Sequence, residues 1–218
     1  FTIAENSVDT TPVDTVIATD QDSGDTLTYS ITGGTGSTAF SINSANGVLS
    51  VAAVGQLDYE TTTTFDVTVQ VADDGTGTLT DSAIITVNLT DVNEAPVIAA
   101  QTFTIDENSV DATPVDTVVG TDVDAGQTLS YSITGGTGST AFSINTSTAV
   151  ISVAAVGQLD YETTTTFGLT VQVADDGIGT LTDSATITVN LNNMNDAPVI
   201  AAQTFTIDEN SVDTTPAD

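Results

Sequence analysis

The stretch Phe65-Asp-Val-Thr-Val-Gln-Val-Ala72 decides the fold class, because apolar and polar residues alternate along its whole length. Successive side chains of a β-strand point to opposite faces, so Phe65 and three valines share one face and the polar residues share the other. The stretch Thr80–Thr90 repeats this period, with apolar residues at Ala83, Ile85, Val87 and Leu89. Both stretches therefore predict β-strands whose apolar faces form a core.

Five further short runs precede these two, and clusters of Gly, Asp, Asn and Thr separate them. This arrangement is typical of an all-β sandwich of the immunoglobulin-like, Greek-key type. The seven expected strands are Phe1–Ala4, Val13–Thr19, Thr26–Thr32, Ala39–Asn43, Val48–Val51, Phe65–Ala72 and Thr80–Thr90. On the outer face of the last strand, Ile84 is replaced by Thr186 in the second copy, as expected for a solvent-facing position.

The chain is a tandem array, because residues 103–204 are a near copy of residues 1–102 and a third copy begins at Phe205. A period of this length indicates whole domains in a row. We expect one repeat over residues 1–97, a second over 98–199 and the start of a truncated third over 200–218. We also expect the chain to be an excerpt from a longer array.

Charge excludes several classes of partner. The chain carries 30 acidic residues and no Lys, Arg or His, which gives a formal charge of −30. Nucleic-acid binding and attachment to anionic lipid both rely on basic side chains, so neither nucleic acid nor direct membrane contact is expected. Cysteine is absent, which rules out disulfides and zinc–thiolate sites. Cations are the expected partners.

The acidic residues recur in five short groups in each repeat, and the first repeat has Glu5-Asn6, Asp20–Asp22, Asp58–Glu60, Asp73–Gly75 and Asp91–Pro96. If the fold brings them together at one end of a sandwich, each close carboxylate pair repels by about 1 kcal/mol even in water. Oxygen ligands of this kind are those that calcium prefers, whereas zinc and copper favour His or Cys. The alternative is a solvated, salt-adapted acidic surface.

These groups, in this order, resemble the cadherin repeat, and in particular the cadherin-like repeats of large bacterial surface adhesins. The family pattern is a Glu before Asn, Asp-x-Asp, Leu-Asp-x-Glu, Ala-x-Asp-x-Gly and Asp-x-Asn-Asp with Ala-Pro. The corresponding residues are Glu5-Asn6, Asp20-Gln21-Asp22, Leu57–Glu60, Ala72–Gly75 and Asp91–Pro96. The resemblance covers both complete repeats.

The resemblance implies that calcium ions lie between successive repeats, which they join into an end-to-end rod. For the complete junction it implies ligands among Glu5, Asp58, Glu60, Asp91, Asn93 and Glu94 of the first repeat and Asp122, Asp124 and Asp176 of the second. Asp175 is the alternative to Asp176, which the motif register favours. The next junction would use Glu107, Asp160, Glu162, Asn195 and Asp196, with further acids from beyond Asp218.

Three positions depart from the family pattern. Glu94 stands in place of Asp, no Asn lies between it and Ala95-Pro96, and Asn193 replaces the counterpart of Asp91. The number of calcium ions at each junction therefore stays open.

The resemblance favours a calcium-stiffened, extracellular spacer of a secreted or surface-attached bacterial adhesin or filament. The alternative is that the repeats themselves adhere, to one another or to a glycan, and calcium-bridged self-association into fibres belongs to this reading. Scarce aromatic residues and the absence of Arg and Trp argue against a strong binding hot spot.

An enzyme is not expected, because Asp58 and Glu60 lie two residues apart and the chain lacks His, Cys and Lys for acid–base or nucleophilic chemistry.

Overall fold

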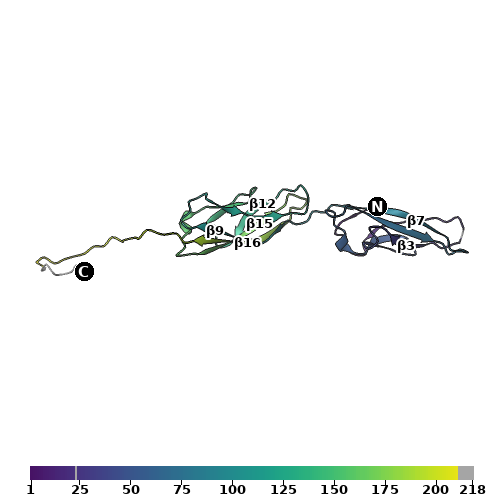
Figure 1. The fold of residues 1–218 in the computed structure, drawn as a ribbon, viewed down its shortest axis with the longest axis horizontal. Helices are drawn as coiled ribbons and strands as arrows, with labels where there is room; N and C mark the ends of the chain where they lie inside the picture. The colour runs from purple at the N-terminus through teal and green to yellow at the C-terminus, as the bar shows by residue number, and fades with distance from the viewer. Residues whose placement is uncertain (23, 211–218) are drawn as a thin grey trace.

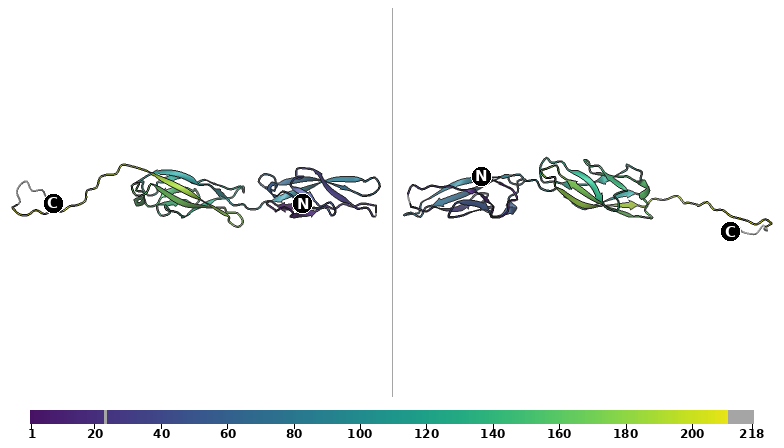
Figure 2. Two further views of the ribbon diagram at one scale, coloured as in Figure 1. Left: turned by 90° about the horizontal axis from the view of Figure 1, so that it is seen from below. Right: turned by 180° about the vertical axis from the view of Figure 1, so that it is seen from behind.

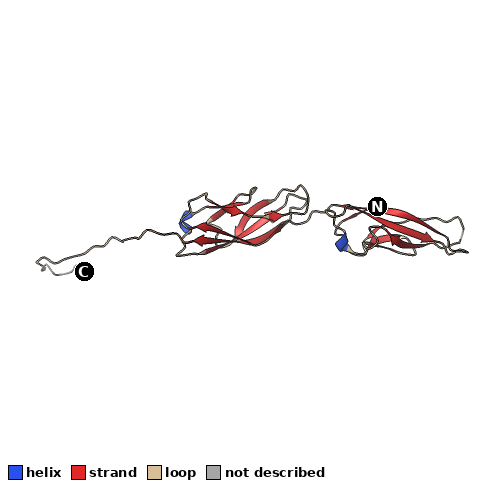
Figure 3. Cartoon of the chain, in the orientation of Figure 1, coloured by secondary structure: helices blue, strands red, loops and turns tan. Residues whose placement is uncertain are grey.

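The computed structural model describes residues 1–22 and 24–210. It places two β-sandwiches end to end, followed by an extended tail (Figure 1). The views from below and behind show the same rod (Figure 2). Strands make up both sandwiches, and the described helices are two short 3₁₀ turns, η1 at Val54–Gln56 and η2 at Val156–Gln158 (Figure 3).

The first sandwich has seven strands in two sheets. One sheet has the order β1-β7-β6-β3 and the other has the order β2-β5-β4. Their bounds are β1 Thr2–Ala4, β2 Pro12–Thr15, β3 Thr28–Gly33, β4 Phe40–Ile42, β5 Val48–Val51, β6 Thr64–Ala72 and β7 Thr80–Thr90. β1 runs parallel to β7, and the other pairs are antiparallel. The expected all-β sandwich is confirmed.

The second sandwich repeats this plan with the sheets β12-β15-β16-β9 and β10-β14-β13. Its main strands are β9 Gln101–Asp106, β10 Pro114–Thr117, β12 Ser130–Gly135, β13 Phe142–Ile144, β14 Val150–Val153, β15 Thr166–Ala174 and β16 Thr182–Asn192. An additional short pair joins β8 (Val97–Ile98) to β11 (Gly120–Thr121).

The second strand of each repeat is shorter than predicted. Instead of one strand over Val13–Thr19, the first repeat has β2 alone, and the second repeat has β10 followed by β11. β11 exists because it pairs with β8, which enters from the linker between the repeats. In the first repeat, residues 16–19 have no such pairing strand among the described residues.

The apolar residues of the alternating strands form the hydrophobic core, as predicted. Phe65, Val67 and Val87 are buried between the sheets of the first repeat, and the Phe65 ring meets the Phe40 ring edge to face, with 5.7 Å between ring centres. Ile84 is 65% exposed on the outer face, as expected. The cores of the two sandwiches are separate clusters, so each repeat has its own hydrophobic centre.

Residues 193–210 form no strand, and their side chains are exposed. Figure 1 shows this tail running away from the second sandwich, at the end opposite the first. Within the described residues, no helix is long and apolar enough to cross a membrane.

Candidate metal centre between the repeats

Glu5 lies directly after β1 and anchors the end of the first sandwich. Its side chain is only 3% exposed. One carboxylate oxygen accepts a hydrogen bond of 2.7 Å from the Tyr59 N–H, and the other accepts one of 2.9 Å from the Val92 N–H. Glu5 therefore fixes both the loop that carries the Asp58–Glu60 motif and the linker that follows β7.

The Asp58–Glu60 loop brings two further carboxylates to Glu5. Oxygens of Glu5, Asp58 and Glu60 all lie within 4.8 Å of one another. Asp58 is held in place by the N–H and hydroxyl of Thr61, which donate hydrogen bonds of 2.9 and 3.0 Å. The three acids therefore form one cluster at the base of the first repeat.

The linker carries the next ligands across to the second repeat. The Glu94 carboxylate accepts a hydrogen bond from the Asn6 amide, so it stays beside the first repeat. The Glu94 N–H donates a 2.8 Å hydrogen bond to Asp124 Oδ2 in the second repeat. The Asn93 amide likewise donates one of 3.1 Å to Asp175. The two repeats are thus joined by direct contacts through Asn93 and Glu94.

The loop between β11 and β12 supplies acids from the second repeat. Asp124 is 6% exposed, and its N–H donates a 3.0 Å hydrogen bond to Asp122 Oδ1, which makes a tight turn. Oxygens of Glu60, Glu94 and Asp124 lie within 4.8 Å of one another. This second cluster combines residues of both repeats.

Several oxygens at the junction are buried and accept no hydrogen bond from the described residues. They are Glu94 Oε2, Asp122 Oδ2, Asp124 Oδ1 and Gln127 Oε1. An unpartnered buried acceptor is costly, and an uncompensated carboxylate is costlier. The chain has no Lys, Arg or His to compensate them. Crowded carboxylate and amide oxygens are the donor set of a hard divalent cation, so these residues fit calcium.

Burial and neighbouring acids raise the pKa values of three carboxyl groups at the junction. Desolvation raises the pKa of Glu94 to about 7, the charges of Glu5 and Asp124 add to the rise, and the Asn6 hydrogen bond opposes it. Desolvation also raises the pKa of Glu60 and of Asp91, and nearby carboxylates including Asp124 reinforce both shifts. A bound cation would stabilise the charged form of these carboxylates and so offset both the desolvation and the repulsion.

The structure brings most of the predicted ligands to the complete junction, and Asp176 differs from them in its contacts. Asp176 is exposed, and its carboxylate accepts a 2.8 Å hydrogen bond from the Thr128 N–H. Its neighbour Asp175 is 3% exposed and faces Asn93. The assignment of Asp176 as a ligand therefore stays a prediction, with Asp175 as the residue that contacts the linker.

Sequence reasoning included Asn6 in the Glu5-Asn6 group without predicting its contact with Glu94, and it overlooked Gln127 altogether. Asn6 contacts Glu94, and the Gln127 amide donates a hydrogen bond to the Asn93 side-chain oxygen. A comparison of the two repeats could have drawn attention to Gln127, because it stands where the first repeat has Asp25. A neutral amide at that position binds the linker without adding a further negative charge.

The far end of the second repeat carries an equivalent half-site. Oxygens of Glu107, Asp160 and Glu162 lie within 4.8 Å of one another. The Met194 N–H donates a 2.7 Å hydrogen bond to Glu107, as Val92 does to Glu5. Both Asn195 and Asp196 are exposed, and the Asn108 amide donates a 2.9 Å hydrogen bond to Asp196.

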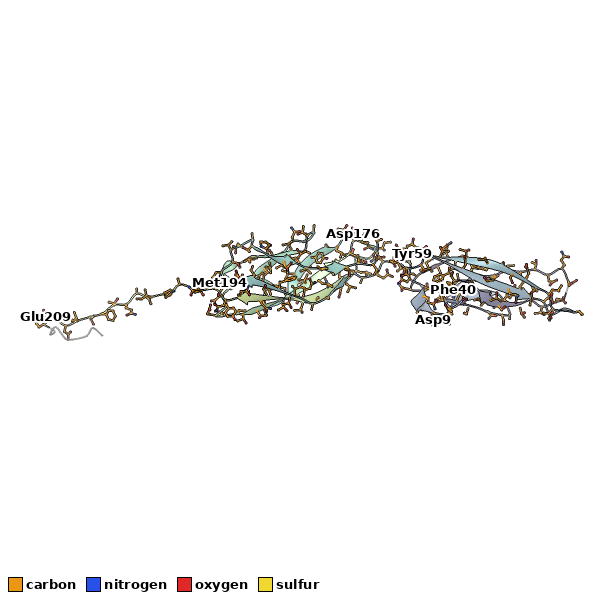
Figure 4. The ribbon with its side chains drawn as sticks, viewed as in Figure 1. Asp9, Phe40, Tyr59, Asp176, Met194 and Glu209 are labelled. Atoms are coloured by element: carbon orange, nitrogen blue, oxygen red, sulfur yellow. The ribbon has the colours of Figure 1, made fainter. Side chains whose placement is uncertain are left out.

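Figure 4 places the two ends of the second repeat. Asp176 lies at the end that faces Tyr59 of the first repeat, and Met194 lies at the opposite end, where the tail begins. The two ends of the second repeat thus carry the residues that contact the first repeat and the tail.

Sandwiches in tandem, each with acids gathered at its ends, define a class of rod-like, multidomain repeat protein. The family model of the cadherin domain matches residues 1–90 and 101–192, and the chain belongs to this family. Protocadherin Fat 1 of Homo sapiens is 33% identical over 187 residues, covering 83% of this chain and 4% of the relative. Protocadherin-like wing polarity protein stan of Drosophila melanogaster is 35% identical over 204 residues, covering 89% of this chain and 6% of the relative.

Among solved structures, mouse cadherin-23 EC22-24 superposes with a TM-score of 0.67 at 26% identity. That superposition covers 89% of this chain and 62% of the mouse chain. By contrast, the chain spans only 4% of the length of protocadherin Fat 1 and 6% of that of the Drosophila relative. The similarity applies to the repeats and their arrangement in tandem.

Proposed function

We propose that residues 1–210 act as a calcium-stiffened spacer, in which calcium bound between the repeats holds the two sandwiches in line. One observation carries the proposal: Glu60, Glu94 and Asp124 converge from two repeats, with buried oxygens that no described residue neutralises. Without a cation these charges push the repeats apart, and a shared divalent cation turns that repulsion into common coordination.

The ligands proposed for this junction divide between the repeats. Glu5, Asp58, Glu60, Asp91, Asn93 and Glu94 would come from the first repeat and Asp122, Asp124 and one of Asp175 and Asp176 from the second. When bound, calcium would supply electrostatic compensation only. The protein itself holds the linker in place, since Glu5 accepts a hydrogen bond from the Val92 N–H and Asp124 accepts one from the Glu94 N–H.

An extracellular location is part of the proposal, and it rests on membership of the cadherin family. Calcium sites of modest affinity suit an extracellular module, where calcium is abundant. The expected bacterial origin stays a prediction, because the relatives named above are animal proteins.

A second candidate function is adhesion by the repeats themselves, and membership of the cadherin family favours it. The sides of the sandwiches carry exposed apolar residues such as Ile84, which a partner could cover. Beads coated with the protein should then aggregate in calcium and disperse in chelator. A spacer alone would leave the beads dispersed in both.

Calorimetric titration tests the calcium proposal. We expect calcium to bind and magnesium to bind far more weakly, because magnesium demands a small octahedral shell and keeps its water. Heats that are equal for the two ions, or that vanish at raised ionic strength, would mean that the acids only attract a diffuse ion atmosphere, and the proposal would be wrong.

A further inference from the structure

The turn between β4 and β5 of the first repeat contains Asn46-Gly47, the only Asn-Gly pair in the sequence. The main-chain nitrogen that follows an asparagine can attack the carbon of the side-chain amide. Glycine obstructs this attack least, because it has no Cβ. The Asn46 side chain is exposed to water. The pair therefore has what the spontaneous loss of ammonia requires.

One hydrogen bond in the turn prepares the Asn46 amide for this attack. The Val48 N–H donates a 3.1 Å hydrogen bond to Asn46 Oδ1. This oxygen gains negative charge when the amide carbon is attacked, and a donor already in place stabilises that charge. The turn therefore polarises the carbonyl group that the attacking nitrogen must reach.

A second hydrogen bond restrains the attacking nitrogen. The Gly47 N–H donates a 2.9 Å hydrogen bond to the Asn43 carbonyl. The Asn43 side-chain oxygen also accepts one of 3.0 Å from the Ala45 N–H, which tightens the same turn. Gly47 is buried and has a φ of 70°, in the left-handed region. Its nitrogen becomes available when the turn opens locally.

The second repeat has the same turn without the reactive pair. Thr148-Ala149 stands where the first repeat has Asn46-Gly47. The Ala149 N–H donates a 2.9 Å hydrogen bond to the Asn145 carbonyl, and Ala149 has a φ of 57°. The fold of the turn therefore does not depend on the Asn-Gly pair, and the two repeats differ in their chemistry at this point.

We propose that Asn46 is a site of spontaneous covalent modification, which water converts to aspartate and isoaspartate at a rate set by the opening of its turn. The Gly47 nitrogen forms a bond to Asn46 Cγ, the bond from Cγ to Nδ2 breaks, and Nδ2 leaves as ammonia with the Gly47 proton. Water then cleaves the cyclic imide at either of its carbonyl carbons. Cleavage at the side-chain carbonyl yields aspartate, and cleavage at the main-chain carbonyl yields isoaspartate.

Isoaspartate changes the main chain itself, because the chain then runs through the side-chain carbon and gains an atom before Gly47. The site has no room for a shift. A Cβ at Gly47 would collide with the Val16 carbonyl oxygen and lie 3.2 Å from the Tyr29 ring. The Gly47 carbonyl also accepts a 2.9 Å hydrogen bond from the Val16 N–H. Val16 follows β2 and Tyr29 lies in β3, so isoaspartate should disturb contacts with both sheets and destabilise the first sandwich.

The charge pattern makes both products readable, because residues 26–57 contain no Asp or Glu. A protease that cleaves before aspartate releases residues 25–57 of the unmodified protein as one peptide. Conversion to aspartate creates a new cleavage before residue 46. Isoaspartate leaves the peptide uncut and changes its mass by the exchange of NH₂ for OH, which fragment spectra locate at residue 46. Residues 124–159 of the second repeat form the corresponding control peptide.

Incubation of the full chain at neutral pH, sampled over weeks, tests the site. We expect conversion at Asn46 and none in the 124–159 peptide. Asn46→Thr, which introduces the residue of the second repeat, should abolish conversion. Thr148→Asn combined with Ala149→Gly should create a second site. An Asn46 that stays unmodified in the folded protein, or that converts no faster than the other asparagines, overturns the proposal.

Asn43→Ala tests the part played by the turn. Loss of the Asn43–Ala45 hydrogen bond should open the turn more often and speed conversion at least about tenfold. Asn145→Ala, at the equivalent position of the second repeat, is the matched control and should leave the rate at Asn46 unchanged. Circular dichroism checks that both variants stay folded, and denaturant should speed conversion in the wild type. Equal rates in the folded wild type, in Asn43→Ala and in denaturant would overturn the control of the rate by the turn.

Discussion

The main-chain N–H of Glu94, at the end of the first repeat, donates a 2.8 Å hydrogen bond to the carboxylate of Asp124 in the second. A buried acid of one domain is thereby tied to the linker from its neighbour. Asp124 has a second oxygen that accepts no hydrogen bond from the described residues. One carboxylate thus connects two repeats and keeps a free acceptor for a cation.

Asp124→Asn tests this position. The change keeps the shape of the side chain and removes one charge, so we expect calcium affinity to fall at least about tenfold, or ~1.4 kcal/mol. Folding of each sandwich should be unchanged. Asp116→Asn, at an exposed position in β10, is the matched control and should bind calcium like the wild type. Equal affinity in the two variants would remove Asp124 from the site.

The pKa of Glu94, raised to about 7, gives a pH dependence with a definite sign. Calcium needs the carboxylate, so binding near pH 7 should release protons and affinity should rise from pH 6 to pH 8. Calorimetry in buffers of different ionisation enthalpy measures this release. Glu94→Gln should remove most of it, and an undiminished release would assign the proton to another group.

The same shift predicts how pH affects the calcium-free protein. Glu94 has a folded-state pKa above the unfolded value of 4.5, so the folded state holds the extra proton between about pH 4.5 and 7. The free energy of unfolding should therefore fall as pH rises through that window and level off above it. Denaturant unfolding in chelator at several pH values checks the trend. Stability that instead rises through the window would contradict it.

Gly177 lies where the linker enters the second repeat. A Cβ at this position would collide with the Asn93 side-chain oxygen and approach the Gln127 amide. Gly177→Ala should therefore displace Asn93, weaken calcium binding and increase bending between the repeats. Gly75→Ala is the control, because its Cβ meets the flexible tip of Asp25 at the far end of the first repeat. Identical scattering curves for both variants would show that Asn93 does not hold the junction.

Ile98 tests whether the linker belongs to the second core. Ile98→Ala should destabilise the second sandwich by about 2–5 kcal/mol, as for other buried aliphatic residues. The first sandwich has a separate core and should unfold as in the wild type. Val97→Ala is the matched control, because Val97 is 60% exposed. Calorimetric unfolding in chelator resolves the two transitions, and a shift in both would refute independent cores.

Sequence reasoning succeeded where a local period determines the structure. The alternation from Phe65 to Ala72 predicted both the strand β6 and its buried face, because strand geometry links the two. The acidic groups were expected to gather at one end of a sandwich, and the resemblance to the cadherin repeat placed them at the junction, where Glu5 and Asp124 lie buried. Their role as calcium ligands stays a prediction.

The remainder depends on contacts between distant residues. The motif register favoured Asp176 over Asp175, and only the fold shows that Asp175 is buried against Asn93 while Asp176 is exposed. The short β8–β11 pair was also overlooked, because Val97 and Ile98 read as linker until their seat on the second sandwich is seen. Both details depend on how one repeat meets the next.

Small-angle scattering of the 218-residue protein is the sharpest test of a junction stiffened by calcium. It should be measured at high dilution, to limit association, in calcium, in magnesium and in chelator at constant ionic strength. We expect a rigid, extended rod in calcium and a flexible pair of domains in the other two solutions. The same curve in all three would contradict a calcium-stiffened junction.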